Sequence, residues 1–168
     1  GDVILTEHWQ IAGEAWPTLA DAPIAPNPYA AGVLFHGPAY QLLTELCIDD
    51  AGSSYWLDLD ASGVPCGVLN QGLMDAATHG IPHDAMERWS AEIPTGMAAY
   101  PVAITTASFY GPAPTGGRVR CEARFAGFRG GDGACIALHR EGLRFGRGAE
   151  GRRSARGPEA KLRNGFGG

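Results

Sequence analysis

The stretch that decides the fold reads Leu69-Asn70-Gln71-Gly72-Leu73-Met74-Asp75-Ala76-Ala77-Thr78-His79-Gly80. At 3.6 residues per turn, its apolar and small residues share one face of a helix, whereas Asp75 and His79 project together from the opposite side as an i, i+4 pair. Gly80 and the following Ile81-Pro82 predict the end of this helix, because glycine favours a left-handed exit and proline disfavours a helical residue before it. The stretch therefore predicts a short helix whose small residues let a sheet approach closely.

The pair formed by Asp75 and His79 has two interpretations. A carboxyl group among Leu, Met and Ala side chains can have a raised pKa and act as an acid near neutral pH. An Asp and a His on the polar side of an amphipathic helix are, however, more often its solvated face. Spacing alone leaves both interpretations open.

The overall composition is that of a globular domain. A chain of 168 residues, 45% hydrophobic and 9% aromatic, is long enough for one domain with a buried core. The net charge of −5 gives no support for nucleic-acid binding. The sequence has no apolar run long enough to span a bilayer and no basic-then-apolar leader, which predicts a cytoplasmic protein without a membrane partner.

Composition also divides the chain. Residues 1–29 form a preceding segment that ends in a proline-rich linker over residues 17–28, where the prolines deny the backbone its ladder hydrogen bonds. Residues 30–128 form the domain. Residues 129–168 hold 9 Lys and Arg against 4 Asp and Glu and are rich in glycine, which predicts a weakly structured tail. Only residues 134–145 offer one or two weak strands, and residues 146–168 are expected to be disordered.

Alternation of polar and apolar residues predicts the strands of the domain. Residues 44–50 and 54–60 flank Asp50-Ala51-Gly52 and resemble a hairpin. Residues 100–110 and 118–125 form two further strands that a Gly/Pro loop over residues 111–117 connects. The inward side chains of the second strand are Val119, Cys121, Ala123 and Phe125. A hairpin, one central helix and then long strands predict an α+β fold in which the helix packs against a curved antiparallel sheet.

Two motifs in this order resemble a known family. Phe35-His36-Gly37-Pro38-Ala39-Tyr40-Gln41 resembles the His/Tyr-Gly-Pro-x-Phe segment, and Leu73-Met74-Asp75-Ala76-Ala77-Thr78-His79 resembles the Leu-Leu-Asp-Ala-x-x-Gln/His segment, of the C-terminal half of dehydratase domains. These domains belong to multidomain polyketide and polyunsaturated fatty-acid synthases. The resemblance covers about residues 30–128.

The resemblance implies a fold, a reaction and partners. The fold is the hotdog, a central helix wrapped by a curved antiparallel sheet, and this chain would be one half of a double hotdog. The reaction, a step of polyketide or fatty acid biosynthesis, removes water from a 3-hydroxyacyl chain carried on the phosphopantetheine arm of an acyl carrier protein. It requires no other cofactor and no metal. Its partners would be that carrier protein and either an N-terminal hotdog half or a second copy bound edge to edge.

The resemblance also implies roles for individual residues. Asp75 would be the general acid that protonates the departing hydroxyl, and His79 would orient it by hydrogen bonding. This chemistry is sensible because hydroxide is a poor leaving group, so that an acid with a raised pKa in an apolar tunnel assists its departure. The motif further places four residues along the substrate tunnel: His36, Gly37, Pro38 and Tyr40. A turn histidine bonded to the backbone is an equally good interpretation of His36.

The catalytic base of the family is not found in this sequence. That base lies in a His-x-x-x-Gly-x-x-x-x-Pro pattern, which none of the five histidines matches; His8, for example, has Ala12 where glycine is required. The chain would therefore carry half an active site. The base lies in another segment, or a second copy supplies it, or the domain binds acyl chains without dehydrating them.

Three other interpretations compete with the dehydratase. A single-hotdog thioesterase would use the helix carboxylate to activate water on an acyl thioester. A non-catalytic hotdog would hold an acyl chain or shape a synthase. His79, His83 and Asp84 suggest a metal site, but Gly80 and Pro82 interrupt the helix between the two histidines, so no metal site is expected there.

Overall fold

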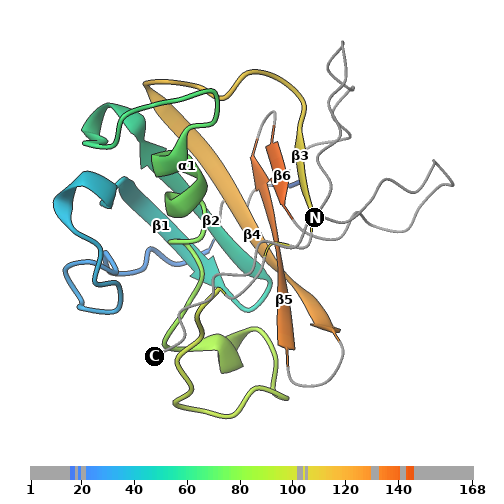
Figure 1. Ribbon diagram of the computed structural model, residues 1–168. Helices are drawn as coiled ribbons and strands as arrows, with labels where there is room; N and C mark the ends of the chain where they lie inside the picture. Colours follow the sequence, from blue (N-terminus) through green and yellow to red (C-terminus); the bar gives the residue numbers. More distant parts are fainter. Residues whose placement is uncertain are drawn as a thin grey trace, which may run out of the picture.

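The computed structural model describes residues 16, 17, 19, 22–101, 104, 106–129, 133–140 and 143–145. Its main feature is a six-stranded antiparallel sheet with the strand order β1-β2-β4-β5-β6-β3 (Figure 1). The strands are β1 (Leu43–Asp49), β2 (Gly52–Asp58), β3 (Ala107–Phe109), β4 (Arg118–Arg129), β5 (Gly133–Arg140) and β6 (Leu143–Phe145). The helices of the described residues are short: η1 (Pro38–Tyr40), η2 (Leu59–Ala61), α1 (Gln71–Ala76) and η3 (Met86–Arg88). An antiparallel sheet with few helices confirms the α+β class.

The predicted hairpin is confirmed and forms one end of the sheet. β1 and β2 pair in register from Glu45 opposite Trp56 to Asp49 opposite Gly52. The turn closes because the Asp49 carboxylate accepts hydrogen bonds from the N–H groups of Ala51 (2.8 Å) and Gly52 (3.1 Å).

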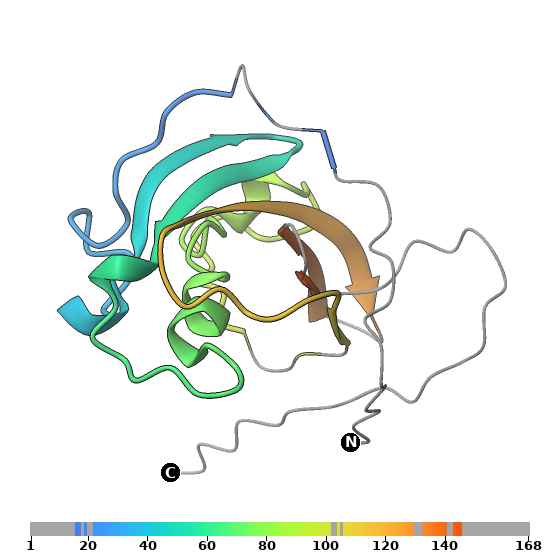
Figure 2. The ribbon, with the colours of Figure 1, turned by 90° about the horizontal axis from the view of Figure 1, so that it is seen from above.

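The sheet curves around α1, which lies inside the curve (Figure 2). The side chains that face the helix come from alternate positions of β2 and β4, as the pleat requires. Val119, Cys121 and Ala123 are buried and Phe125 is partly buried, which confirms the predicted inward set of β4. Opposite them, Tyr55 and Leu57 of β2 are fully buried, and burying each such side chain stabilises the fold by about 1.5–3 kcal/mol.

Helix α1 is shorter than its sequence pattern predicts. It begins after Asn70, whose side-chain oxygen accepts a hydrogen bond from the Leu73 N–H at 2.9 Å. It ends at Ala76, because the N–H groups of Thr78 and His79 then bond to carbonyls three residues earlier and tighten the chain into turns. His79 therefore lies beyond the helix, in the turn that follows it.

Gly80 is required for a different reason from the predicted one. The expected left-handed exit is wrong, because Gly80 is not among the glycines with positive φ. A Cβ atom at this position would instead overlap the ring of Tyr55, and that ring is held in place by a hydrogen bond from its hydroxyl to the Ala77 carbonyl oxygen. The small residue thus allows the turn that carries His79 to lie directly on the sheet, as the sequence predicts for the small residues of this stretch.

We expect Gly80→Ala to lower the free energy of unfolding by about 1–3 kcal/mol, because the added methyl group must displace a fully buried ring. The measurement is urea unfolding followed by fluorescence. Gly111→Ala is the matched control, since a Cβ atom at Gly111 meets nothing within 4 Å. Equal stabilities of the two variants would contradict the packing described for Gly80.

The proline-rich segment before the domain makes more backbone contacts than its sequence predicts. Ile24 forms an isolated antiparallel bridge with Cys47. The Ala25 N–H donates to the Leu46 carbonyl at 2.8 Å, and the Ile48 N–H donates to the Pro23 carbonyl at 3.0 Å. The prediction that this segment forms no ladder bonds is therefore wrong, because proline lacks only the N–H and its carbonyl still accepts. The segment covers part of the outer edge of β1.

The second half of the chain differs from the prediction in its pairing. Within the predicted strand over residues 100–110, β3 is the only described strand, and it pairs with β6 rather than with β4. The weak strands predicted in residues 134–145 are confirmed as β5 and β6, which extend the sheet beyond the boundary expected at residue 128. Residues 1–15, which include His8, and the expected disorder of residues 146–168 lie outside the described residues.

No helix among the described residues combines the length and the hydropathy of a membrane-spanning helix.

Candidate active site

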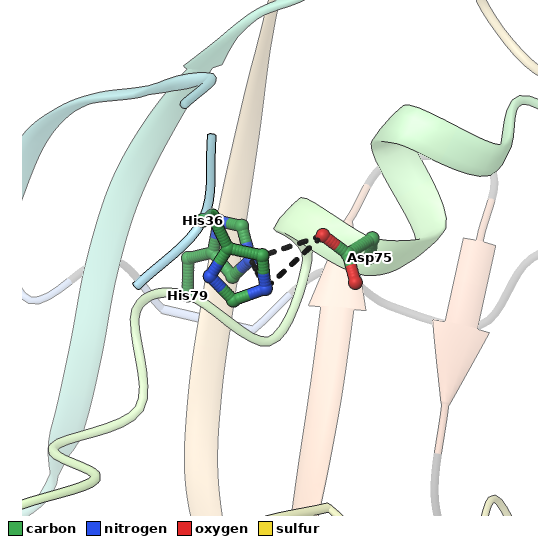
Figure 3. A group of neighbouring side chains, drawn as sticks. All are labelled: His36, Asp75 and His79. Atoms are coloured by element: carbon green, nitrogen blue, oxygen red, sulfur yellow. Dashed lines mark hydrogen bonds and ion pairs between the residues drawn. The ribbon is translucent and has the colours of Figure 1, made fainter. Parts of the chain in front are cut away.

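Three side chains from separate parts of the chain meet beside α1 (Figure 3). Asp75 comes from the helix, His79 from the turn after it, and His36 from the loop before η1. Asp75 Oδ2 lies 3.2 Å from His79 Nε2 and 3.5 Å from His36 Nε2. The two Nε2 atoms are 3.3 Å apart. We refer to these three residues as the His–Asp–His cluster.

The members of the cluster differ in their access to solvent. The His79 side chain is 0% exposed, whereas the side chains of Asp75 and His36 are 39% and 23% exposed. The solvated-face interpretation is therefore wrong for His79. His79 remains beside Asp75 although the helix has ended, because the tight turn keeps the two residues on the same side. Asp75 and His36 form the accessible part of the cluster.

Tyr29 contacts the ring nitrogen of His79 that does not face Asp75, and the sequence did not predict this contact. Its hydroxyl lies 2.6 Å from His79 Nδ1 and accepts a hydrogen bond from the Leu43 N–H at 3.2 Å. When neutral His79 carries its proton on Nε2, facing Asp75, the Tyr29 hydroxyl donates to Nδ1. Tyr29 lies 50 residues from His79 in the sequence, and no spacing rule connects them.

We expect Tyr29→Phe to lower the free energy of unfolding by about 1–3 kcal/mol, because His79 Nδ1 and the Leu43 N–H both lose their partner in a half-buried place. The measurement is urea unfolding, with Tyr100→Phe as the control, since Tyr100 is 66% exposed. An unchanged stability of the Tyr29 variant would show that water replaces the hydroxyl and that Tyr29 does not fix His79.

The loop that carries His36 is fixed by its neighbours. The Gln41 side chain donates a hydrogen bond to the His36 carbonyl oxygen at 2.7 Å. Gly37 is extended and caps η1, and Pro38 occupies the first position of that helix, where its fixed φ suits the helix and its missing N–H is not needed. The imidazole stacks on Phe35 with an interplanar angle of 8°. The alternative of a turn histidine whose ring bonds to the backbone is not observed, because Nδ1 has no hydrogen-bond partner among the described residues and Nε2 faces the cluster.

The other predicted tunnel residues lie next to His36. Gly37 and Pro38 are exposed, and Tyr40 is 36% exposed. The Tyr40 carbonyl oxygen lies 3.5 Å from the Tyr29 hydroxyl, so that η1 also supports the tyrosine that contacts His79. Their role toward a substrate stays a prediction.

The charges of the cluster correct the expected pKa of Asp75. Burial raises the pKa of Asp75, but the close contact with His79 and the charges of His79 and His36 together outweigh it, so the pKa lies below its ordinary value. The expected raised pKa is therefore wrong, since histidines and not only apolar groups surround the carboxyl. Burial, and next the neighbouring His79, lower the pKa of His36. At neutral pH the resting cluster thus holds an ionised Asp75 beside a neutral His36.

His83 takes no part in the cluster. Its Nδ1 lies 2.8 Å from the Ala99 carbonyl oxygen, and its Nε2 lies 2.9 Å from the Thr78 carbonyl oxygen. The ring is buried and ties the turn after α1 to residue 99. Both ring nitrogens are occupied by the backbone, so His83 serves the structure of this turn.

Comparisons with known proteins give one match, to a solved structure. No family model and no curated protein matches this chain. Among solved structures it is similar to one from a study of dehydratase substrate selection for the borrelidin and fluvirucin polyketide synthases, with 18% sequence identity and a TM-score of 0.45. The match covers 89% of this chain and 54% of the other, so this chain spans about half the length of its neighbour.

Proposed function

We propose that this chain is the C-terminal hotdog half of a 3-hydroxyacyl dehydratase in a polyketide or polyunsaturated fatty-acid synthase. The observation that carries the proposal is the convergence of His36, Asp75 and His79 beside the central helix. The motifs that resemble the family supply two segments of this arrangement. One brings His36, and the other brings Asp75 and His79.

The cluster has the groups that the departure of water needs. In the proposed reaction a base removes the proton from C2 of the acyl chain, the C3–O bond breaks, and the departing hydroxyl takes a proton to leave as water. Asp75 is the group with access to the substrate, and it delivers this proton. Asp75 rests ionised, so it first takes up this proton from the solvent, beside imidazole Nε2 atoms that lie 3.2 and 3.5 Å from Oδ2. His79 is a positioning residue, because it is buried and contacts Asp75 rather than solvent.

The proposal includes partners. The base comes from an N-terminal hotdog half or a second copy, since no histidine of this chain lies in the family's base motif. The substrate arrives on the phosphopantetheine arm of an acyl carrier protein. The base releases to the solvent the proton that it took from C2, and the cluster gives one proton to the hydroxyl. A complete turnover therefore consumes no acid.

The test is mass spectrometry of a 3-hydroxyacyl thioester bound to a carrier protein. The thioester is incubated with this chain alone and with the longer polypeptide that its coding sequence specifies. We expect loss of one water from the thioester in the longer polypeptide only. Absence of this loss in both samples would contradict the proposal.

The same assay separates the competing functions. Release of the free hydroxy acid would identify a thioesterase, because hydrolysis breaks the thioester and leaves the hydroxyl in place. Stable binding of the acylated carrier without any mass change would identify a non-catalytic acyl-binding hotdog. Both results would overturn the dehydratase.

A further inference from the structure

The three atoms that meet in the cluster have the spacing of metal ligands. His36 Nε2, His79 Nε2 and Asp75 Oδ2 form a triangle with sides of 3.3, 3.2 and 3.5 Å. In a tetrahedral zinc complex with bonds of about 2.0–2.2 Å, neighbouring ligand atoms lie about 3.3–3.5 Å apart. In an octahedral complex of similar bond length, adjacent ligands lie only about 3.0 Å apart. The observed triangle fits the tetrahedral spacing better.

The orientation of the rings supports a shared ligand point. The imidazole centres of His36 and His79 are 4.1 Å apart, whereas their Nε2 atoms are 3.3 Å apart, so the rings converge toward these atoms. In a tetrahedral complex the ring centres would be about 5 Å apart. His36 lies in the loop before η1 and is partly exposed, so its ring has room to tilt outward toward this spacing.

The surroundings of the cluster fit a metal better than a hydrogen-bonded triad. Asp75 Oδ2 is buried and makes no well-formed hydrogen bond within the described residues, although two ring nitrogens face it. A metal on His79 Nε2 places the His79 proton on Nδ1, which then donates to the Tyr29 hydroxyl at 2.6 Å. The Tyr29 hydrogen is then free to bond to the Tyr40 carbonyl oxygen at 3.5 Å. Such a second partner on a ligating histidine is usual in zinc sites.

We propose that His36 Nε2, Asp75 Oδ2 and His79 Nε2 bind a Zn²⁺ ion and leave its fourth coordination position open. Two imidazoles and one carboxylate are ligands that zinc accepts, whereas Mg²⁺ and Ca²⁺ prefer oxygen alone. Three protein ligands with one open position are typical of catalytic zinc sites. The exposure of Asp75 and His36 gives the ion its access to the site.

This inference does not rest on the proposed dehydration, and it has a consequence for it. A carboxylate oxygen that binds a metal carries no proton. Zinc bound to Asp75 therefore prevents the proton delivery that the dehydratase proposal assigns to this residue. Zinc is expected to inhibit dehydration, and removal of zinc by a chelator is expected to restore it.

The test is titration of the untagged 168-residue chain with Co²⁺, followed by displacement with Zn²⁺. Co²⁺ reports its geometry directly, since tetrahedral Co²⁺ absorbs visible light far more strongly than octahedral Co²⁺. We expect one equivalent of Co²⁺ to give the tetrahedral spectrum and one equivalent of Zn²⁺ to abolish it. His36→Ala is expected to weaken binding at least about 100-fold, through the loss of a ligand. Asp84→Asn is the control, because Asp84 is exposed and lies outside the cluster.

Several results would overturn the zinc site. They are the absence of binding, an octahedral spectrum, and binding that survives His36→Ala. A sulfur charge-transfer band would also overturn it, because it would place the ion on a thiol such as the exposed Cys66.

A second variant tests the zinc ligand at position 79 without leaving a cavity there. His79→Gln keeps a hydrogen-bonding side chain between Tyr29 and Asp75 but removes a metal ligand, because an amide is a poor ligand for zinc. We expect this variant to remain folded and to lose zinc binding, and zinc binding that survives the substitution would overturn the site. If the unmodified protein dehydrates the thioester but does not bind zinc, the zinc site alone is refuted. If it binds zinc but does not dehydrate the thioester, the dehydratase alone is refuted.

Discussion

Asp75→Asn is expected to reduce the dehydration of a carrier-bound 3-hydroxyacyl thioester by about 10²–10⁴-fold, because the amide cannot deliver a proton to the departing hydroxyl. Asn has nearly the same size as Asp, and the Asp75 side chain is 39% exposed, so the fold is expected to persist. The measurement is the rate at which the thioester loses water, determined by mass spectrometry in the longer polypeptide. Circular dichroism checks that the variant is folded.

Asp84→Asn is the matched control for this effect. Asp84 is exposed, lies nine residues after Asp75 and takes no part in the cluster. It is expected to leave the rate unchanged. A rate for Asp75→Asn close to that of the unmodified protein would remove Asp75 from the reaction, and an equal loss in both variants would indicate a general effect of charge.

His79→Ala has the second large expected effect, because it removes a side chain that is 0% exposed. The cavity and the unpaired Tyr29 hydroxyl are expected to lower the free energy of unfolding by about 2–4 kcal/mol. The rate of dehydration is expected to fall by about 10²-fold or more, since Asp75 loses the contact that orients it. Urea unfolding and the mass-spectrometric assay measure the two effects separately.

His79→Gln tests whether His79 only orients Asp75 or also exchanges a proton during the reaction. The amide can bond to Tyr29 and to Asp75 but does not titrate. If His79 only positions Asp75, the glutamine variant retains most of the activity that the alanine variant loses. Equal losses in the two variants would show that His79 itself exchanges the proton, and its role as a positioning residue would be wrong.

The pairing of Asp75 with His79 could be predicted because it depends on local spacing. Four residues along a helix return to nearly the same side, and the tight turn after Ala76 preserves that relation although the helix has ended. The hairpin and the inward face of β4 could be predicted for the same reason, since alternation along a strand assigns its two faces. These parts of the fold are encoded within a few consecutive residues.

The contribution of His36 to the cluster could not be deduced from spacing. His36 and His79 are 43 residues apart, and only the packing of η1 beside α1 brings them together. The family motif associated His36 with a tunnel but did not place it against Asp75. Because the pKa of Asp75 depends on both histidines, its direction could not be predicted either.

The burial of Glu122, on the opposite face of β4, could not be predicted from the sequence pattern either. Alternation places it outward, yet its side chain is only 5% exposed, because Arg120 and Arg124 bind its two oxygens at 3.1 and 3.0 Å. Ser54 of β2 donates a further hydrogen bond at 2.6 Å. A charge on the outer face of a sheet is thus buried by its neighbours, which a pattern of polar and apolar residues does not reveal.

The measurement that tests the central proposal most directly follows oxygen from solvent into the product. The 2-enoyl thioester is incubated with the longer polypeptide in water enriched in the heavy oxygen isotope, so that the reverse of dehydration is observed. The dehydratase proposal predicts heavy oxygen in the C3 hydroxyl of a thioester that remains intact, and none of it with Asp75→Asn. Heavy oxygen in the carboxylate of a released acid, or equal labelling of C3 with and without Asp75, would contradict the proposal.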